Sequence, residues 1–162
     1  MNNLSKRKIL RLKNYDYSQS GMYYVTISTN HKQKLFGHVK NEQFIPNEAG
    51  KMIACHLKRV ENRFKNVDID YYVIMPDHIH AIIDKTKAVG HGDPTLQQIL
   101  QWYKSITTHE YSKGVKTCIF KAYNKYLWQR SYYEHIIRNE KDLNEIRKYI
   151  QDNPLKQCLE DA

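Results

Sequence analysis

Two histidines separated by one residue, His78 and His80, are the side chains in this sequence best suited to hold a metal ion. They follow the apolar run YYVIM and the turn residues Pro76 and Asp77. If they lie on a β-strand, both imidazoles point to one face, roughly 7 Å apart at their Cα atoms, because strand side chains alternate. Two imidazoles on one face can bind a single ion. The pair alone also fits two half-exposed histidines without a ligand.

Two histidines leave a metal coordination shell incomplete, and a third ligand has to come from elsewhere in the chain. Six other histidines are present, and no spacing recommends any one of them: His31, His38, His56, His91, His109 and His135. Tyr149 and Asn153 lie four residues apart, so on a helix they share one face. A tyrosine beside a metal-bound phosphate can act as a nucleophile, and the Asn153 carbonyl oxygen can bind the same ion. Spacing alone favours a packed aromatic at Tyr149, and it cannot select one nucleophile among 13 tyrosines.

The elements that must position these side chains can be predicted from the distribution of apolar and turn residues. Runs of β-branched and aromatic residues predict strands at residues 22–29, 35–39, 43–45, 68–75 and 78–83. Helical spacing of apolar residues predicts helices that begin near Asn47, at Thr95 and at Asn139. The second helix is expected to reach residue 111, and Pro154 is expected to end the third. Hairpins separated by helices indicate an α+β fold, with a central antiparallel sheet flanked by helices.

The charge balance favours a polyanionic partner. Twenty-six Lys and Arg residues against 17 Asp and Glu residues give a formal net charge of +9. Release of counterions from phosphates makes nucleic acid a suitable partner, although a soluble basic protein has the same composition. Tyrosine rings can also stack on unpaired bases. The candidate phosphate contacts are Lys6, Arg7, Lys8, Arg11 and Lys13 in a basic N-terminal arm, and Lys104, Arg130 and Arg138 further along the chain.

Composition also excludes several classes of protein. With 162 residues, 41% of them hydrophobic, the chain suits a single globular domain. No apolar run approaches the roughly 18 residues that span a bilayer, and residues 1–13 lack the apolar region of a secretory signal. Cys55, Cys118 and Cys158 have no C-x-x-C spacing, which argues against a zinc ribbon or a disulfide framework. We therefore expect a cytoplasmic protein.

Five segments, in this order, resemble the REP-associated tyrosine transposases, which are relatives of the single-tyrosine HUH transposases of insertion sequences. HUH denotes two histidines around a bulky apolar residue, which His78-Ile79-His80 satisfies. The segments span nearly the whole chain and are residues 15–29, residues 35–37, MPDHIH at residues 75–80, WQRSYYEHIIR at residues 128–138 and YIQDNP at residues 149–154.

This resemblance implies specific roles. His78 and His80 match the metal-binding histidines, Tyr149 matches the nucleophile in preference to Tyr132 and Tyr133, and Asn153 stands where relatives place a polar third ligand. It also implies a ferredoxin- or RRM-like HUH nuclease fold, dependence on Mg²⁺ or Mn²⁺, and cleavage and rejoining of single-stranded hairpin DNA through a 5′-phosphotyrosine. The implied organisation is a basic arm at residues 1–14, one domain at residues 15–158 and a tail at residues 159–162.

Two other functions are compatible with the residues. The first is a non-catalytic module that binds single-stranded nucleic acid on an antiparallel sheet, and such a module needs neither the histidine pair nor Tyr149. The second is a plasmid-type replication initiator, which uses the same chemistry in a larger protein. The resemblance favours a monomer, although relatives in insertion sequences form dimers that exchange the tyrosine helix.

Overall fold

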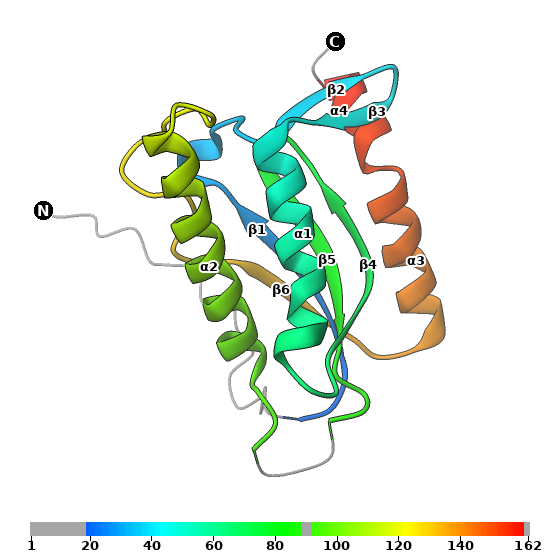
Figure 1. Ribbon diagram of the computed structural model, residues 1–162. Helices are drawn as coiled ribbons and strands as arrows, with labels where there is room; N and C mark the ends of the chain where they lie inside the picture. The colour runs from blue at the N-terminus through cyan, green and yellow to red at the C-terminus, as the bar shows by residue number, and fades with distance from the viewer. Residues whose placement is uncertain (1–18, 89–91, 161–162) are drawn as a thin grey trace, which may run out of the picture.

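The strands and helices form an antiparallel sheet covered by helices on both faces (Figure 1). A computed structural model describes residues 19–88 and 92–160. In chain order the elements are β1 (Met22–Ser28), the 3₁₀ turn η1 (Asn30–Lys32), β2 (Gly37–Lys40), β3 (Gln43–Pro46), α1 (Glu48–Arg63), β4 (Asp68–Ile74), β5 (His78–Asp84), α2 (Leu96–Lys116), β6 (Tyr133–Ile137), α3 (Glu140–Gln151) and α4 (Asn153–Glu160).

The central sheet has the strand order β4-β5-β1-β6, and each neighbouring pair is antiparallel. The hairpin of β4 and β5 is the one that the sequence predicts, with its turn at Pro76 and Asp77. The strands β2 and β3 form a separate two-stranded sheet. The predicted α+β class, with an antiparallel sheet flanked by helices, is therefore confirmed.

The main hydrophobic core lies between the sheet and the helices α1 and α2, which stand side by side in front of the sheet in Figure 1. From β5 it receives Ile79, Ala81 and Ile83, each at most 1% exposed. Strand alternation places the residues between them, His80 and Ile82, on the opposite face. The apolar residues of β5 therefore determine the direction in which its histidines point.

A smaller core covers part of the opposite face of the sheet. Its buried members are Tyr24 on β1, Ile82 on β5 and Ile150 on α3, with Leu143 and Ile146 of α3 packed against them. The helix α3 thus buries its apolar stripe on the sheet face that carries the histidines. Because this core is small, two polar contacts that hold α3 at the edges of the sheet contribute to its placement.

Each of these two contacts joins α3 to an edge strand. Arg147 donates two hydrogen bonds to the Asp70 carboxylate on β4, with N···O distances of 2.9 and 2.5 Å. At the opposite edge, His135 Nε2 on β6 lies 2.9 Å from Asp142 Oδ2. Asn139 accepts from the Asp142 backbone N–H, so it is the N-cap that the sequence predicts.

The sequence predicted most element positions, and the structure corrects two helix ends and adds a strand. The helix capped by Thr95 runs to Lys116 rather than to residue 111. Pro154 does not end the last helix, because α3 ends at Gln151 and Pro154 lies in the first turn of α4. Proline is tolerated there since the first helical N–H groups have no partner within the helix. The edge strand β6 and the helix α4 were not predicted.

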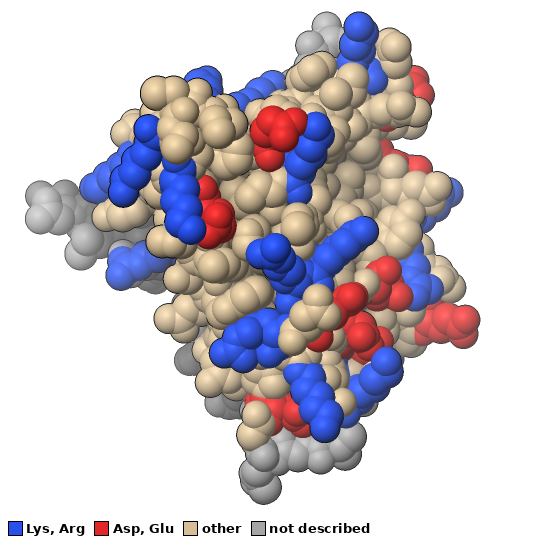
Figure 2. All heavy atoms as spheres, viewed as in Figure 1, with Lys and Arg blue, Asp and Glu red and all other residues tan. Residues whose placement is uncertain are grey.

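Charge is distributed widely over the surface. On the face that carries α1 and α2, Lys and Arg side chains lie over both helices, with fewer Asp and Glu side chains between them (Figure 2). The proposed basic arm, with Lys6, Arg7, Lys8, Arg11 and Lys13, falls outside the described residues. Within the described part of the chain, no helix is long and apolar enough to cross a membrane.

The contact between His135 and Asp142 predicts a pH-dependent stability. The hydrogen bond from His135 is the largest cause that holds the pKa of the Asp142 carboxyl below its ordinary value. A carboxyl with a lowered folded-state pKa contributes stability above its unfolded-state pKa, about 3.9, and the contribution is lost as the pH falls through the folded-state pKa. We expect Asp142→Asn to lower the free energy of unfolding at pH 6, measured by urea denaturation, and the difference from wild type to shrink toward pH 3.

The control for this prediction is Glu42→Gln, which removes an exposed carboxylate in the turn between β2 and β3. This variant should have the same free energy of unfolding as wild type at pH 6 and at pH 3. If the free energy of unfolding of Asp142→Asn stays below that of wild type by the same amount from pH 6 to pH 3, the role assigned to the carboxylate is wrong.

Candidate active site

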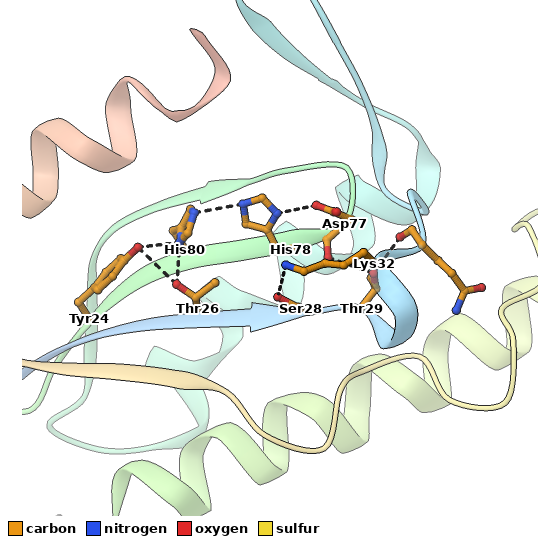
Figure 3. A network of polar contacts seen from close by, with 9 residues as sticks. Tyr24, Thr26, Ser28, Thr29, Lys32, Asp77, His78 and His80 are labelled. Carbon is orange, nitrogen blue, oxygen red and sulfur yellow. Dashed lines mark hydrogen bonds and ion pairs between the residues drawn. The ribbon is translucent and has the colours of Figure 1, made fainter. Parts of the chain in front are cut away.

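The two histidines of β5 face each other on the side of the sheet that α3 partly covers. In the register of β1 and β5, His78 lies opposite Ser28 and His80 lies opposite Thr26. The His78 Nε2 and His80 Nε2 atoms are 3.1 Å apart. Figure 3 shows the rings in one row, with Asp77 beyond His78 and with Tyr24 beyond His80. Two nitrogen lone pairs brought this close repel each other unless a proton or a cation lies between them.

The other ring nitrogen of each histidine has a protein partner. His78 Nδ1 lies 2.5 Å from Asp77 Oδ1. His80 Nδ1 lies 2.8 Å from both Thr26 Oγ1 and Tyr24 OH. Contacts of this kind fix ring orientation and leave the opposite nitrogen available to a ligand. These partners therefore hold each ring by its Nδ1 atom, so that the two Nε2 atoms face each other.

Burial strongly perturbs the protonation of this cluster. Desolvation, assisted by the positive charges of His78 and Lys32, lowers the pKa of His80 to about 3. Burial acts to raise the pKa of Asp77, but the hydrogen bond from His78 and nearby positive charges outweigh it and leave this pKa below its ordinary value. His80 is therefore neutral near pH 7, which is the form of histidine that binds metal ions.

The spacing of the two Nε2 atoms fits a shared metal ion. At metal–nitrogen distances of about 2.1 Å, two ligands at a right angle are about 3 Å apart, and two at the tetrahedral angle are about 3.4 Å apart. The observed 3.1 Å lies between these values. In the described part of the chain, no group of three His, Cys, Asp or Glu side chains could hold a metal. Further ligands would thus have to be amide oxygens, water or the substrate.

Tyr149 lies on α3 next to this pair. Its ring centroid is 5.5 Å from that of His80, and the residue is 41% exposed. Tyr24 contacts the same histidine at a ring-centroid distance of 5.7 Å, but it is 8% exposed and lies on the Nδ1 side. Burial is the main cause that raises the pKa of Tyr24 to about 12, which disfavours its phenolate. Of these two tyrosines, Tyr149 is the one that a ligand can reach.

Two adjoining hollows meet at Tyr149. Both are lined by Thr26, Lys32, His80 and Tyr149. The larger, about 640 Å³, continues over β6 and the start of α3. The smaller, about 350 Å³, contains the histidine pair and is bounded by Asp77 and α4. The shared lining residues join the two hollows into one cleft beside Tyr149.

The helix α4 forms one wall of the smaller hollow. Asn153, the first residue of α4, is buried and lines this hollow together with both histidines. The sequence predicted that Tyr149 and Asn153 share a face of one helix, but the helix breaks at Asp152, so Tyr149 lies on α3 and Asn153 begins α4. Both nevertheless line the hollow that contains the histidine pair. Lys156 lies one turn further on, and its Nζ is 4.2 Å from the Tyr149 ring centroid. The structure thus brings together all four residues assigned to catalysis and metal binding.

Lys32 is a site residue that sequence reasoning missed. It lies on η1, directly after β1, and its Nζ donates to Ser28 Oγ at 3.0 Å. No motif pointed to it, because it is one of 26 Lys and Arg residues and lies 46 positions before His78. Only the pairing of β1 with β5 shows that it belongs to the cleft.

The predicted phosphate-binding residues outside the arm do not line either of the two hollows beside Tyr149. Lys104 Nζ donates to the backbone carbonyls of Gln129 at 2.8 Å and Ser131 at 3.4 Å, and burial lowers its pKa to about 8. These bonds tie α2 to the segment that leads into β6. Arg130 and Arg138 are exposed, and their contact with DNA stays a prediction.

Comparison with known proteins gives a consistent family relationship. The sequence profile of the family described as "Transposase IS200 like" matches residues 18–153. A protein of Haemophilus influenzae described as uncharacterized is 38% identical over 92% of this chain and 88% of its own length. A REP-associated tyrosine transposase of Escherichia coli is 30% identical over 58% of this chain and 48% of its own length.

One solved structure shows the likeness of fold. It is that of a REP-associated tyrosine transposase bound to a REP hairpin, and it shares 22% sequence identity with this chain. The alignment covers 91% of this chain and 74% of that one, with a TM-score of 0.64.

Because the ion pair of Arg147 and Asp70 holds α3 to β4, we expect it to protect the backbone amides of α3 from hydrogen exchange. We expect Arg147→Met to accelerate backbone amide exchange in α3 by several-fold, measured by hydrogen–deuterium exchange, while exchange in α1 stays unchanged. The effect is modest because the Arg147 side chain is 39% exposed and water screens the pair. Lys148→Met, an exposed neighbour on the same helix, is the control. Equal exchange in α3 of both variants and wild type would show that Asp70 does not hold this helix.

Proposed function

The chain belongs to the IS200-like transposase family, and we propose that it cleaves and rejoins single-stranded DNA through a covalent bond to Tyr149. The observation that carries this proposal is the meeting of an exposed tyrosine with two inward-facing imidazole nitrogens in one cleft. A protein that only binds nucleic acid does not require this combination.

The proposed reaction is the transfer of a phosphodiester to a tyrosine oxygen. Tyr149 Oη forms a bond to phosphorus while the bond from phosphorus to the 3′-oxygen breaks. The phenol loses its proton, and the departing 3′-oxygen gains one, so the products are a 5′-phosphotyrosine and a free 3′-hydroxyl. Attack by a 3′-hydroxyl on the phosphotyrosine reverses the step. Because one phosphoester replaces another, no external energy source is consumed.

We propose Mg²⁺ or Mn²⁺ as the cofactor, held by His78, His80 and Asn153. Bound there, the ion supplies polarisation of the phosphoryl oxygens. The protein contributes the orientation of the ligands. Asp77 fixes the His78 ring, Thr26 and Tyr24 fix the His80 ring, and burial keeps His80 neutral. The Asn153 carbonyl oxygen is a hard ligand suited to either ion.

The proposed substrate is DNA that folds into a hairpin next to a single-stranded segment. Support comes from the net charge of +9 and from the solved relative, which is bound to a REP hairpin. The cleft also extends from the histidine pair past Tyr149 to β6 and the start of α3, which gives an extended strand room to lie along it. The site is assembled within one chain, which supports a monomer as the active form.

The nucleophile can be tested by trapping covalent protein–DNA adducts. The probe is a pool of DNA strands with one fixed hairpin, randomised single-stranded flanks and a 3′-fluorescent label, incubated with protein and Mn²⁺. We expect wild type to form adducts that survive denaturing electrophoresis and Tyr149→Phe to form none, because the attacking oxygen is missing. The matched control is Tyr126→Phe, which removes a hydroxyl from a 60% exposed tyrosine elsewhere and should link as wild type does.

The same experiment separates the enzyme from the two alternatives. Adducts in Tyr149→Phe would contradict the assignment of the nucleophile. Binding of the pool by wild type, without adducts in Mg²⁺ or Mn²⁺, would favour the non-catalytic binding module. Nicking at one defined sequence without rejoining would favour a replication initiator.

The metal site can be tested without DNA by titrating Mn²⁺ and following the free ion by electron paramagnetic resonance. We expect one bound ion in wild type, and binding at least about 10-fold weaker in His78→Ala, because a ligand is lost. Asp77→Asn should weaken binding by about 10- to 100-fold through the orientation of His78. The control is His109→Ala, an exposed histidine on α2, which should bind as wild type does. Wild-type affinity in His78→Ala would place the ion elsewhere.

A further inference from the structure

We propose that Lys32 is a catalytic residue that binds the phosphate attacked by Tyr149 and stabilises the charge on its non-bridging oxygens. This inference rests on the proposed function, and it adds a cation supplied by the protein itself.

The ammonium group of Lys32 ends on the sheet face that carries the histidines. Its Nζ donates to Ser28 Oγ at 3.0 Å, and Ser28 is the residue paired with His78 in the sheet. Figure 3 shows the side chain of this exposed lysine running back along β1, with its ammonium group beside Ser28 and toward the histidine row. Lys32 lines both hollows beside Tyr149. A phosphate that bridges the histidine pair and Tyr149 therefore lies within reach of this ammonium group.

The backbone around Lys32 has an uncommon conformation. His31 and Lys32 have φ values of +55° and +53°, in the left-handed region that residues other than glycine rarely adopt. Such a conformation persists when surrounding contacts enforce it, and it is often found where function requires a particular side-chain position. Two consecutive residues of this kind direct the Lys32 side chain back over β1.

Hydrogen bonds hold this turn on both sides. Thr29, which is fully buried, donates its hydroxyl to the carbonyls of Gln33 at 2.9 Å and Asp77 at 3.0 Å. Gln33 also donates to the carbonyl of Asn30 at 2.8 Å. The turn is thus tied to the Pro76–Asp77 turn that precedes His78. These bonds fix the backbone that carries Lys32 relative to the histidines before any substrate binds, and the bond to Ser28 holds its ammonium group on the same side, an arrangement that favours transition-state stabilisation.

The two other lysines discussed above are placed differently. Lys104 donates to two backbone carbonyls beside β6. Lys156 lies over the Tyr149 ring and lines only the smaller hollow. Lys32 bonds to a serine hydroxyl, and this bond can be exchanged for a stronger charge-assisted bond to a phosphate oxygen. The chemistry of phosphoryl transfer, in which charge develops on oxygen, makes such a cation effective.

The test compares Lys32→Met, which keeps the length of the side chain and removes its charge, with Lys32→Arg, which keeps the charge. The substrate is one full-length strand of the hairpin pool, chosen because wild type links to it when strands are assayed individually. The rate of covalent linking is measured in a single turnover at saturating DNA and Mn²⁺, and DNA affinity is measured separately by anisotropy. A second substrate carries a neutral methylphosphonate at the cleaved linkage. Lys40→Met, at the end of β2, is the control for the loss of one positive charge.

We expect Lys32→Met to slow linking by about 100-fold or more, the effect of removing one donor to a developing oxyanion. Lys32→Arg should recover most of the rate, Lys40→Met should match wild type, and all variants should bind DNA within about 3-fold of wild type. The methylphosphonate should slow wild type more than it slows Lys32→Met, because in wild type it removes the charge that Lys32 contacts.

Any of four results would overturn the inference. Linking by Lys32→Met at the wild-type rate, or equal sensitivity of both proteins to the methylphosphonate, would exclude a contact with the phosphate while leaving the proposed function in place. A slow Lys32→Met whose DNA affinity falls in proportion would make Lys32 a binding residue only. Failure of wild type to form any adduct would overturn the proposed function, and the role of Lys32 with it.

Discussion

The site depends on one constraint, the alternation of side chains along β5. Because Ile79, Ala81 and Ile83 are buried against α1 and α2, His78 and His80 must lie on the opposite face of the sheet. A shift of one residue in the register would bury both imidazoles and expose the isoleucines, so the hydrophobic core itself enforces the position of the histidine pair. The neighbouring strand β1 follows the same register and supplies Tyr24 and Thr26, which orient the His80 ring. Chemistry and stability are therefore set by the same strand pairing.

The second face of the sheet explains why the site is open. The helix α3 covers this face around Ile82 and Tyr24 but leaves Tyr149 exposed beside the histidines. A small apolar core and two edge contacts hold the helix, so it is placed accurately without sealing the cleft. The position of α3 on the sheet therefore affects the proposed reaction of Tyr149, because it fixes the distance between the tyrosine and the histidine pair.

Local sequence patterns were sufficient for most of the fold, because strand alternation, helix caps and turn residues act over short distances. The hairpin of β4 and β5 and the caps Thr95 and Asn139 were predicted on that basis. The strand β6 was missed because an edge strand between loops has a weak apolar pattern, and the position of Pro154 was misjudged because proline both ends helices and begins them. Among the site residues, spacing picked out the histidine pair only as one candidate, and both its assignment to a metal ion and the choice of Tyr149 needed the family resemblance. Lys32 could not be predicted, since its role arises from a backbone turn and from strand pairing across the sheet.

Attack of Tyr149 on DNA can be tested by locating the linked residue in the wild-type adduct. Trypsin cleaves after Lys148 and Lys156, so the nucleophile lies in a peptide of residues 149–156 that contains a single tyrosine. After nuclease digestion, mass spectrometry should find nucleotide mass on this peptide, with fragment ions that assign it to Tyr149. Nucleotide mass on the peptide of residues 131–138, which contains Tyr132 and Tyr133, would contradict the account.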